Sequence, residues 1–188
     1  MHSIQKISSA LLWVFNLLLV VLPLFMIAQW GLIEWAPFRN LVAEGMFFKP
    51  IETPEGFVNL ANIALTPLSK SIGLVGSLVG MLPVFWGIMI LRQIFQNYQR
   101  GNIFSTENAK KYQYLGWLFF IDGILVQPLT GMLMVLTATL SNPVGHRYIS
   151  LTFGTPNLET FFCGILIIVI SKVMAEGSKL QEEQRLTI

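Results

Sequence analysis

The stretch RQIFQNYQRGNIFSTENAKKYQY, residues 92–114, separates two hydrophobic halves of the chain. It carries four basic residues against a single acid, Glu107. Because positive residues concentrate in the cytoplasmic loops of membrane proteins, we expect this segment, called the elbow below, to lie in the cytoplasm. That assignment determines on which side of the membrane every other segment lies.

Composition places the chain among membrane proteins. Of its 188 residues, 54% are hydrophobic and 12% are charged, whereas about 25% of residues are charged in an average soluble domain. The formal charge of +2 is small and the twelve Lys and Arg are dispersed, so we expect no direct contact with nucleic acid. The single cysteine, Cys163, cannot form an internal disulfide and is expected to pack inside an apolar helix.

Four apolar segments are long enough to cross a bilayer core of about 30 Å as helices. They cover about residues 7–28, 72–91, 115–140 and 158–173. The sequence therefore predicts an all-α membrane protein, with residues 1–188 forming a single integral membrane domain. Its four transmembrane helices would form two hairpins of the same orientation in the lipid bilayer.

The basic residues also orient the remaining segments. Eight of the twelve Lys and Arg lie on the same side of the predicted membrane as the elbow, and four lie on the opposite side. Both termini and the tail, 174–188, are therefore predicted to be cytoplasmic, with loops 29–71 and 141–157 outside. In the first loop, Trp30 and Trp35 are typical of the aromatic belt at a membrane interface.

The external loops also contain strand-like phrases. Residues 57–66 alternate partly between apolar and polar side chains, which is typical of a short strand. Residues 63–67 also resemble residues 149–156, since each of these two phrases ends a loop just before a span. The two phrases could pair, which predicts a small extracytoplasmic β-cap.

Small residues mark two further structural features. Gly76 and Gly80 form a GxxxG pattern, which favours close helix packing within one subunit over a specific homo-oligomer, the alternative. In the elbow, Gly101-Asn102 indicates a turn, and Ser105 is a predicted N-cap for a helix starting at Thr106.

The third predicted span carries the strongest candidate for an intramembrane site. At about 100° per residue, Asp122, Gln127 and Thr130 fall on one helix face. An ionisable residue within a span is costly, so Asp122 leads the functional candidates; counted from Leu115, it lies about 10 Å into the helix. Arg92 and Lys172 end neighbouring spans on the same side. A structural ion pair or a hydrated aspartate therefore competes with a proton or ion site.

The sequence shows no signature of an enzyme. It contains no HExxH, CxxC, GxSxG or P-loop pattern. His2 and His146 fall on opposite sides of the membrane in the predicted threading, so they would not share a metal. We expect no catalytic residue, no cofactor and no metal.

Two phrases carry a family resemblance: residues 101–109 followed by Leu115-Gly116, and residues 176–188. In these phrases the chain resembles the YoaS-like proteins, a bacterial family of four-span membrane proteins of the domain-of-unknown-function 2975 type. The resemblance implies the bacterial inner membrane. It also implies a cytoplasmic partner, because that family is similar in gene setting to membrane proteins encoded beside helix-turn-helix regulators of the Cro/CI type.

Together these observations predict a non-enzymatic sensory or regulatory membrane protein that engages a cytoplasmic partner through the elbow and the tail. The residues expected to bind that partner are Arg100, Asn102, Phe104, Glu107, Asn108, Lys110, Lys111, Lys179, Glu182, Glu183 and Arg185. The alternative is a small transporter or channel subunit that uses the polar face around Asp122.

Overall fold

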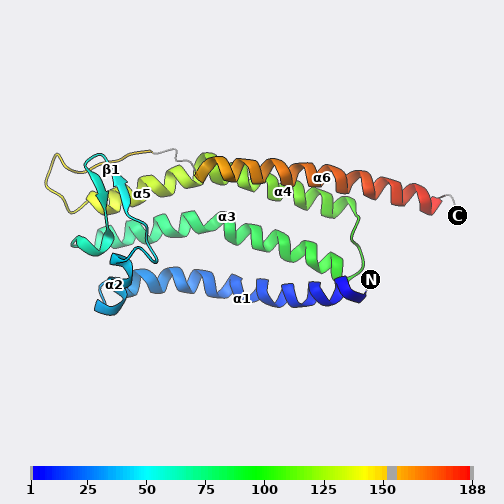
Figure 1. Ribbon diagram of the computed structural model, residues 1–188, viewed down its shortest axis with the longest axis horizontal. Helices are drawn as coiled ribbons and strands as arrows, with labels where there is room; N and C mark the ends of the chain where they lie inside the picture. The colour runs from blue at the N-terminus through cyan, green and yellow to red at the C-terminus, as the bar shows by residue number, and fades with distance from the viewer. Residues whose placement is uncertain (1, 152–155, 187–188) are drawn as a thin grey trace. The chain divides into compact units, whose positions relative to one another are not determined.

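The computed structural model describes residues 2–151 and 156–186 of the chain, and Figure 1 shows the elements in order. Long helices dominate, with one short hairpin between the first two long ones. The elements are α1 (His2–Leu32), α2 (Ala36–Ala43), β1 (Ile51–Thr53), β2 (Gly56–Val58), a 3₁₀ turn (Leu60–Asn62), α3 (Pro67–Gln99), α4 (Thr106–Ile121), a π-helical turn (Asp122–Val126), α5 (Gln127–Thr139) and α6 (Pro156–Leu186).

Four helical runs are long and apolar enough to cross a membrane. They are Ile4–Leu32, Pro67–Gln99, Thr106–Thr139 and Leu158–Leu180, the third being α4, the π turn and α5 taken together. Helices of this length exceed the roughly 20 residues that a bilayer core requires. The predicted all-α class with four transmembrane helices is confirmed, and the chain is a multi-pass membrane protein.

A small two-stranded sheet is present, as predicted, but it does not pair residues 63–67 with residues 149–156. β1 pairs antiparallel with β2, with Ile51 opposite Val58 and Thr53 opposite Gly56. Residues 63–66 and 149–151 form no strand, and 152–155 lie outside the described residues. A local hairpin closes a short loop at Gly56, whose φ is +118°, whereas pairing the two distant phrases would cost more loop-closure entropy.

The end of the first strand-like phrase caps a helix instead. The backbone N–H of Ser69 donates to Thr66 Oγ1 at 3.2 Å, in the first turn of α3. Threonine suits this position because its side-chain oxygen satisfies an amide that the helix leaves unpaired.

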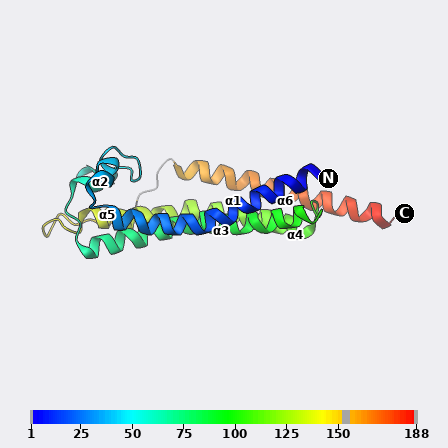
Figure 2. The ribbon, with the colours of Figure 1, turned by 90° about the horizontal axis from the view of Figure 1, so that it is seen from below.

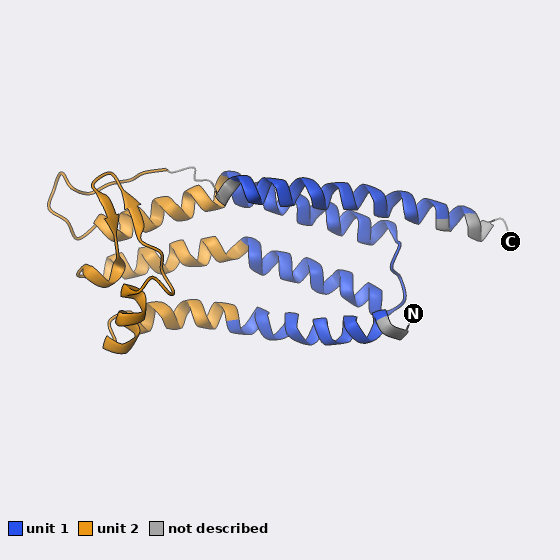
Figure 3. Cartoon of the chain, in the orientation of Figure 1, with its two compact units in different colours: residues 1–21, 83–124, 155–188 blue, residues 22–82, 125–154 orange. Residues whose placement is uncertain are grey.

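The chain divides into two compact units, coloured separately in Figure 3. Unit 1 contains residues 1–21, 83–124 and 155–188, and unit 2 contains residues 22–82 and 125–154. The units divide α1 and α3 beside Pro23 and Pro83, and they divide the π turn between Ile124 and Leu125.

In unit 1, α4 and α6 pack closely, and Figures 1 and 2 both show α6 beside α4. Glycines make the approach close: a Cβ added to Gly116 would lie 3.0 Å from the Gly164 carbonyl oxygen. Ser171 Oγ donates to the Ala109 carbonyl at 2.9 Å. Small residues and interhelical hydrogen bonds are what hold helices together in lipid.

Unit 2 has a hydrophobic core that includes Trp30, with 4% of its surface exposed, and Val42, which is fully buried. The indole Nε1 of Trp30 donates to Ser77 Oγ at 2.9 Å, and the ring occupies the space that a Cβ on Gly73 would need. The prediction that Trp30 anchors the chain at the membrane interface is therefore wrong, because Gly73 opens a place for the indole inside the protein.

The GxxxG pattern packs within the chain, as the sequence favoured. A Cβ on Gly76 would lie 3.0 Å from Leu133 Cβ, and one on Gly80 would lie 3.0 Å from Thr130 Cγ2. The two glycines therefore let α3 and α5 approach closely in unit 2.

Candidate functional site

The elbow forms the turn that its sequence predicts. α3 ends at Gln99, Gly101 takes a φ of +85°, and α4 begins at Thr106. Ser105 is the N-cap, since its Oγ accepts a hydrogen bond from the backbone N–H of Asn108 at 3.2 Å. The predicted N-cap and helix start are confirmed.

Asn108 holds the turn from inside. Its side chain is fully buried, and its Nδ2 donates to the backbone carbonyls of Asn102 at 2.8 Å and Ile103 at 3.0 Å. Its Oδ1 accepts a hydrogen bond from Asn97 Nδ2 at 2.8 Å. Asn108 was predicted to bind a partner; its burial means that it shapes the elbow without lying on the surface.

The elbow and α6 meet in one surface, called the elbow–tail surface below. Thr106 Oγ1 lies 3.3 Å from Ser178 Oγ, and a Cβ on Gly177 would lie 3.1 Å from Phe104 Cδ1. Between them is a pocket of about 230 Å³, lined by residues 101–106 with Ser178 and Glu182. Two segments that are 72 residues apart in sequence thus contribute to one polar pocket.

The other predicted partner-binding residues surround this surface or lie near it in sequence. Lys111 Nζ lies 2.5 Å from Glu107 Oε1, and Lys179 Nζ lies 2.9 Å from Glu176 Oε1. Arg100, Asn102, Phe104, Lys110, Glu182 and Glu183 are exposed. The side chain of Arg185 lies outside the described residues, and binding of a partner stays a prediction.

Asp122 lies far from both ends of the helical run that contains it. It follows Thr106 by sixteen residues and precedes Thr139 by seventeen, so it is at the middle of the helical run. The predicted depth of about 10 Å was counted from Leu115, nine residues after the helix begins at Thr106, and it stays a prediction. Asp122 also opens the π turn Asp122–Val126, so the uniform 100° spacing assumed for Gln127 and Thr130 does not hold across it.

The remaining intramembrane candidates have separate surroundings. Arg92 Nε donates to Asn16 Oδ1 on α1 at 2.7 Å, and Lys172 is exposed. Gln127 and Thr130 belong to unit 2, whereas Asp122, Arg92 and Lys172 belong to unit 1. Among the residues that the structure describes, Thr130 Oγ1 is a buried oxygen without a hydrogen-bond partner.

Asp122 lines a cavity of about 370 Å³ within unit 1. Its walls come from α3, α4 and α6, and of the described residues that line it Asp122 alone is ionisable. We call it the Asp122 cavity. A pocket of roughly 300–1,000 Å³ with mainly apolar walls and few polar groups is typical of a small-molecule site.

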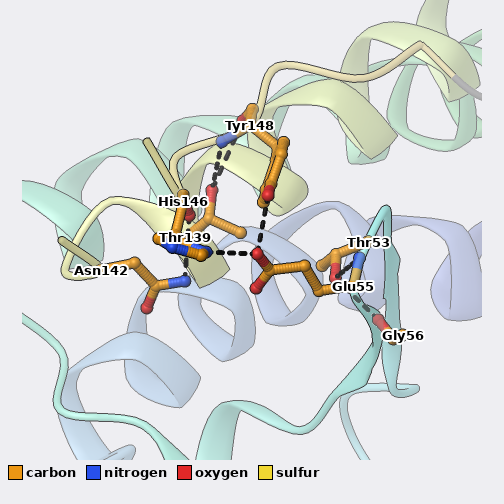
Figure 4. Close-up of polar contacts among 7 residues, drawn as sticks. All are labelled: Thr53, Glu55, Gly56, Thr139, Asn142, His146 and Tyr148. Carbon is orange, nitrogen blue, oxygen red and sulfur yellow. Dashed lines mark hydrogen bonds and ion pairs between the residues drawn. The ribbon is translucent and has the colours of Figure 1, made fainter. Parts of the chain in front are cut away.

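A third polar cluster, in the loops of unit 2, was not predicted (Figure 4). Glu55 Oε1 lies 2.5 Å from His146 Nδ1 and accepts a hydrogen bond from the Tyr148 hydroxyl at 2.7 Å. Figure 4 shows the Glu55 carboxylate between the His146 and Tyr148 rings. Thr139 makes a separate contact, since its Oγ1 accepts a hydrogen bond from the Tyr148 backbone N–H at 3.0 Å. We call Glu55, His146 and Tyr148 the loop cluster.

The contacts in the loop cluster shift two ionisation equilibria. The hydrogen bond from Tyr148, followed by the one from His146, lowers the pKa of Glu55 below its ordinary value of 4.5. The same bond to Glu55 raises the pKa of Tyr148 above its ordinary value of 10.0. The cluster joins the β1–β2 hairpin to the loop after α5, because Glu55 lies in the hairpin turn.

No sequence motif predicts the loop cluster. Glu55 and His146 are 91 residues apart, so their proximity follows from folding alone. Within the described ranges, no group of three or more His, Cys, Asp or Glu side chains could hold a metal ion.

Comparison with known proteins places the chain in a family. No curated protein and no solved structure matches it. A family model with the description "Protein of unknown function (DUF2975)" matches residues 1–188. Since that match covers the full sequence, the protein belongs to the DUF2975 family of proteins of unknown function.

Proposed function

We propose that this protein is a non-enzymatic, sensory or regulatory protein of the bacterial inner membrane, and that the elbow–tail surface engages a cytoplasmic partner. The loops of unit 2 would face the outside, where the loop cluster offers polar groups to solvent. The positive elbow supports this orientation, because basic loops stay in the cytoplasm.

The observation that carries the proposal is the continuity of the elbow–tail surface. Phe104 is 51% exposed although it packs against Gly177, and it lines a pocket in which most of the other lining residues are polar. An exposed aromatic beside a polar pocket is a typical anchor for a protein partner. The family resemblance makes a Cro/CI-type helix-turn-helix regulator the proposed partner.

Site-specific photocrosslinking tests the proposal. A photoreactive phenylalanine analogue at position 104 is expected to crosslink a cytoplasmic helix-turn-helix regulator in living cells. The matched control carries the same analogue at Phe57, which is 76% exposed in unit 2, and it is expected to give no such product. Equal recovery of the regulator from both positions, or its recovery from neither, would contradict the proposal.

A second candidate function, a small transporter or channel subunit, is supported by one observation. Asp122 is an ionisable residue at the middle of a helical run, and it lines a cavity. Such residues commonly mark ion or substrate pathways. Ion flux into proteoliposomes that is lost in Asp122→Ala and kept in Glu159→Gln would support this function. Equal ion flux in the two variants would contradict the transporter or channel function.

A further inference from the structure

We propose that the Asp122 cavity binds a lipophilic cation, an organic molecule with an apolar body and one positive charge. This inference goes beyond both proposed functions, because binding requires neither a protein partner nor flux across the membrane. It depends on the shape, the lining and the charge of the cavity within unit 1.

The apolar walls of the cavity favour a ligand whose main part is apolar. α3 contributes Gly87 and Ile88, α4 contributes Leu118 and Phe119, and α6 contributes Ile167. In lipid, such walls hold an apolar body by van der Waals packing, because the acyl chains are themselves apolar. A cavity of about 370 Å³ has room for several rings or a branched alkyl group, which would pack against these walls.

The Asp122 carboxylate favours a ligand with a positive charge. Among the described residues that line the cavity Asp122 is the only ionisable one, and Coulomb attraction is several times stronger near apolar walls than in water. Asp122 already interacts with a group of the protein, and a carboxylate can accept several polar contacts at once. The Phe119 ring also lines the cavity, and an aromatic face attracts a cation.

The same lining disfavours the other ligand classes. Ca²⁺ takes six to eight oxygen ligands and Mg²⁺ requires octahedral coordination, whereas a single carboxylate lines this cavity. An anion would be repelled by Asp122. A neutral apolar molecule would fit the walls but would gain nothing from the carboxylate.

The ligand would enter from the lipid. Val84 lines the cavity and 56% of its surface is exposed, so the rim opens on the outer side of α3. Since α3 is one of the helices that can cross a membrane, that side would face the acyl chains, from which a lipophilic cation could enter. The π turn that begins at Asp122 agrees with a binding role, because π turns recur at functional sites.

A matched pair of ions tests the inference on the wild-type protein. Tetraphenylphosphonium and tetraphenylborate have nearly the same size and shape but opposite charge. Equilibrium dialysis against the full-length protein in lipid nanodiscs, with empty nanodiscs subtracted, is expected to show saturable binding of tetraphenylphosphonium only. Equal binding of the two ions, or binding of neither, would overturn the proposal.

Two variants then locate the bound cation. Asp122→Asn keeps the shape of the side chain but removes its charge, and it is expected to weaken tetraphenylphosphonium binding at least tenfold. Glu159→Gln removes a carboxylate from the first turn of α6 and is expected to leave binding unchanged. An equal affinity in Asp122→Asn and the wild type would show that the cation binds elsewhere.

Gly87→Leu tests the cavity without touching the charge. A Cβ at Gly87 would lie 3.5 Å from Leu115 Cδ1, an ordinary contact, so a leucine there would fill the space and reduce binding. Gly131→Leu is the control, because a Cβ at Gly131 has nothing within 4 Å. If Gly87→Leu folds with native helix content and binds as tightly as Gly131→Leu, the assigned cavity is wrong.

Discussion

Asn97 donates a hydrogen bond from its side-chain amide to the side-chain oxygen of Asn108 at 2.8 Å, and both residues are buried. This bond joins the end of α3 to the start of α4. Because Asn108 also donates to two backbone carbonyls of the turn, one side chain satisfies three polar groups of the elbow.

Asn108→Ala is therefore expected to destabilise the elbow. A buried polar group that loses its partner costs about 1–3 kcal/mol, and the substitution removes the Asn108 partner of the buried Asn97 amide and of two partly buried carbonyls. Thermal unfolding in detergent should show a lower midpoint for Asn108→Ala than for Asn102→Ala, whose exposed side chain can be removed while its carbonyl remains. Equal midpoints would show that the buried amide does not hold the turn.

Ser105→Ala is expected to lower the free energy of unfolding by about 1 kcal/mol, because the N-cap hydrogen bond to the Asn108 N–H is lost. Ser105→Asp should retain the stability of the wild type, since aspartate is an equally good N-cap. Denaturant titration followed by circular dichroism measures both. A loss of the same size in both variants would mean that the hydroxyl acts in some other way.

Gly116→Leu is expected to separate α4 from α6. Its side chain would collide with Ile168 and with the backbone of Gly164, and overpacking of this kind costs about 1–3 kcal/mol or more. Gly131→Leu is again the control, since that position has open space. The unfolding midpoint in detergent should fall for Gly116→Leu alone, and an unchanged midpoint would contradict the close approach of the two helices.

The loop cluster predicts a pH dependence of defined sign. The pKa of Glu55 is lowered, so its contribution to stability is present above pH 4.5 and is lost as the pH falls through the lowered folded-state value. The pKa of Tyr148 is raised, so its contribution is present below pH 10.0 and is lost as the pH rises through the raised value. The stabilisation is therefore expected to extend from about pH 5 to about pH 9.

Thermal unfolding of Glu55→Gln measures this dependence. Its midpoint should be below that of the wild type at neutral pH, and the difference should shrink as the pH falls below 4.5. Glu52→Gln removes another exposed hairpin carboxylate, one outside the loop cluster, and should match the wild type at every pH. A difference for Glu55→Gln that persists unchanged in acid would show that the carboxylate charge is not responsible.

The features that depend on local sequence could be predicted. Hydropathy and length sufficed for the four helical runs, and the serine at position 105 identified the start of α4. Gly76 and Gly80 indicated a close helix contact, which the structure places between α3 and α5. Each of these depends on residues within a few turns of one another.

The features that depend on long-range contacts could not be predicted. Glu55 and His146 come together across 91 residues, and the burial of Trp30 needs the space left by Gly73. The π turn Asp122–Val126 replaces a regular helix just before Pro128, and the hydropathy pattern did not indicate it. Periodicity assumes a uniform helix, so it misplaced the polar face that follows.

The central claim, that the elbow–tail surface faces the cytoplasm and the loops face outward, is tested most directly by cysteine labelling. The variants Arg100→Cys and Val144→Cys, both at exposed positions, are made in a background in which Cys163, the single native cysteine, is replaced by alanine. We predict that a membrane-impermeant maleimide labels Val144→Cys in intact spheroplasts and labels Arg100→Cys only after the membrane is opened. Labelling of Arg100→Cys in intact spheroplasts would contradict the account.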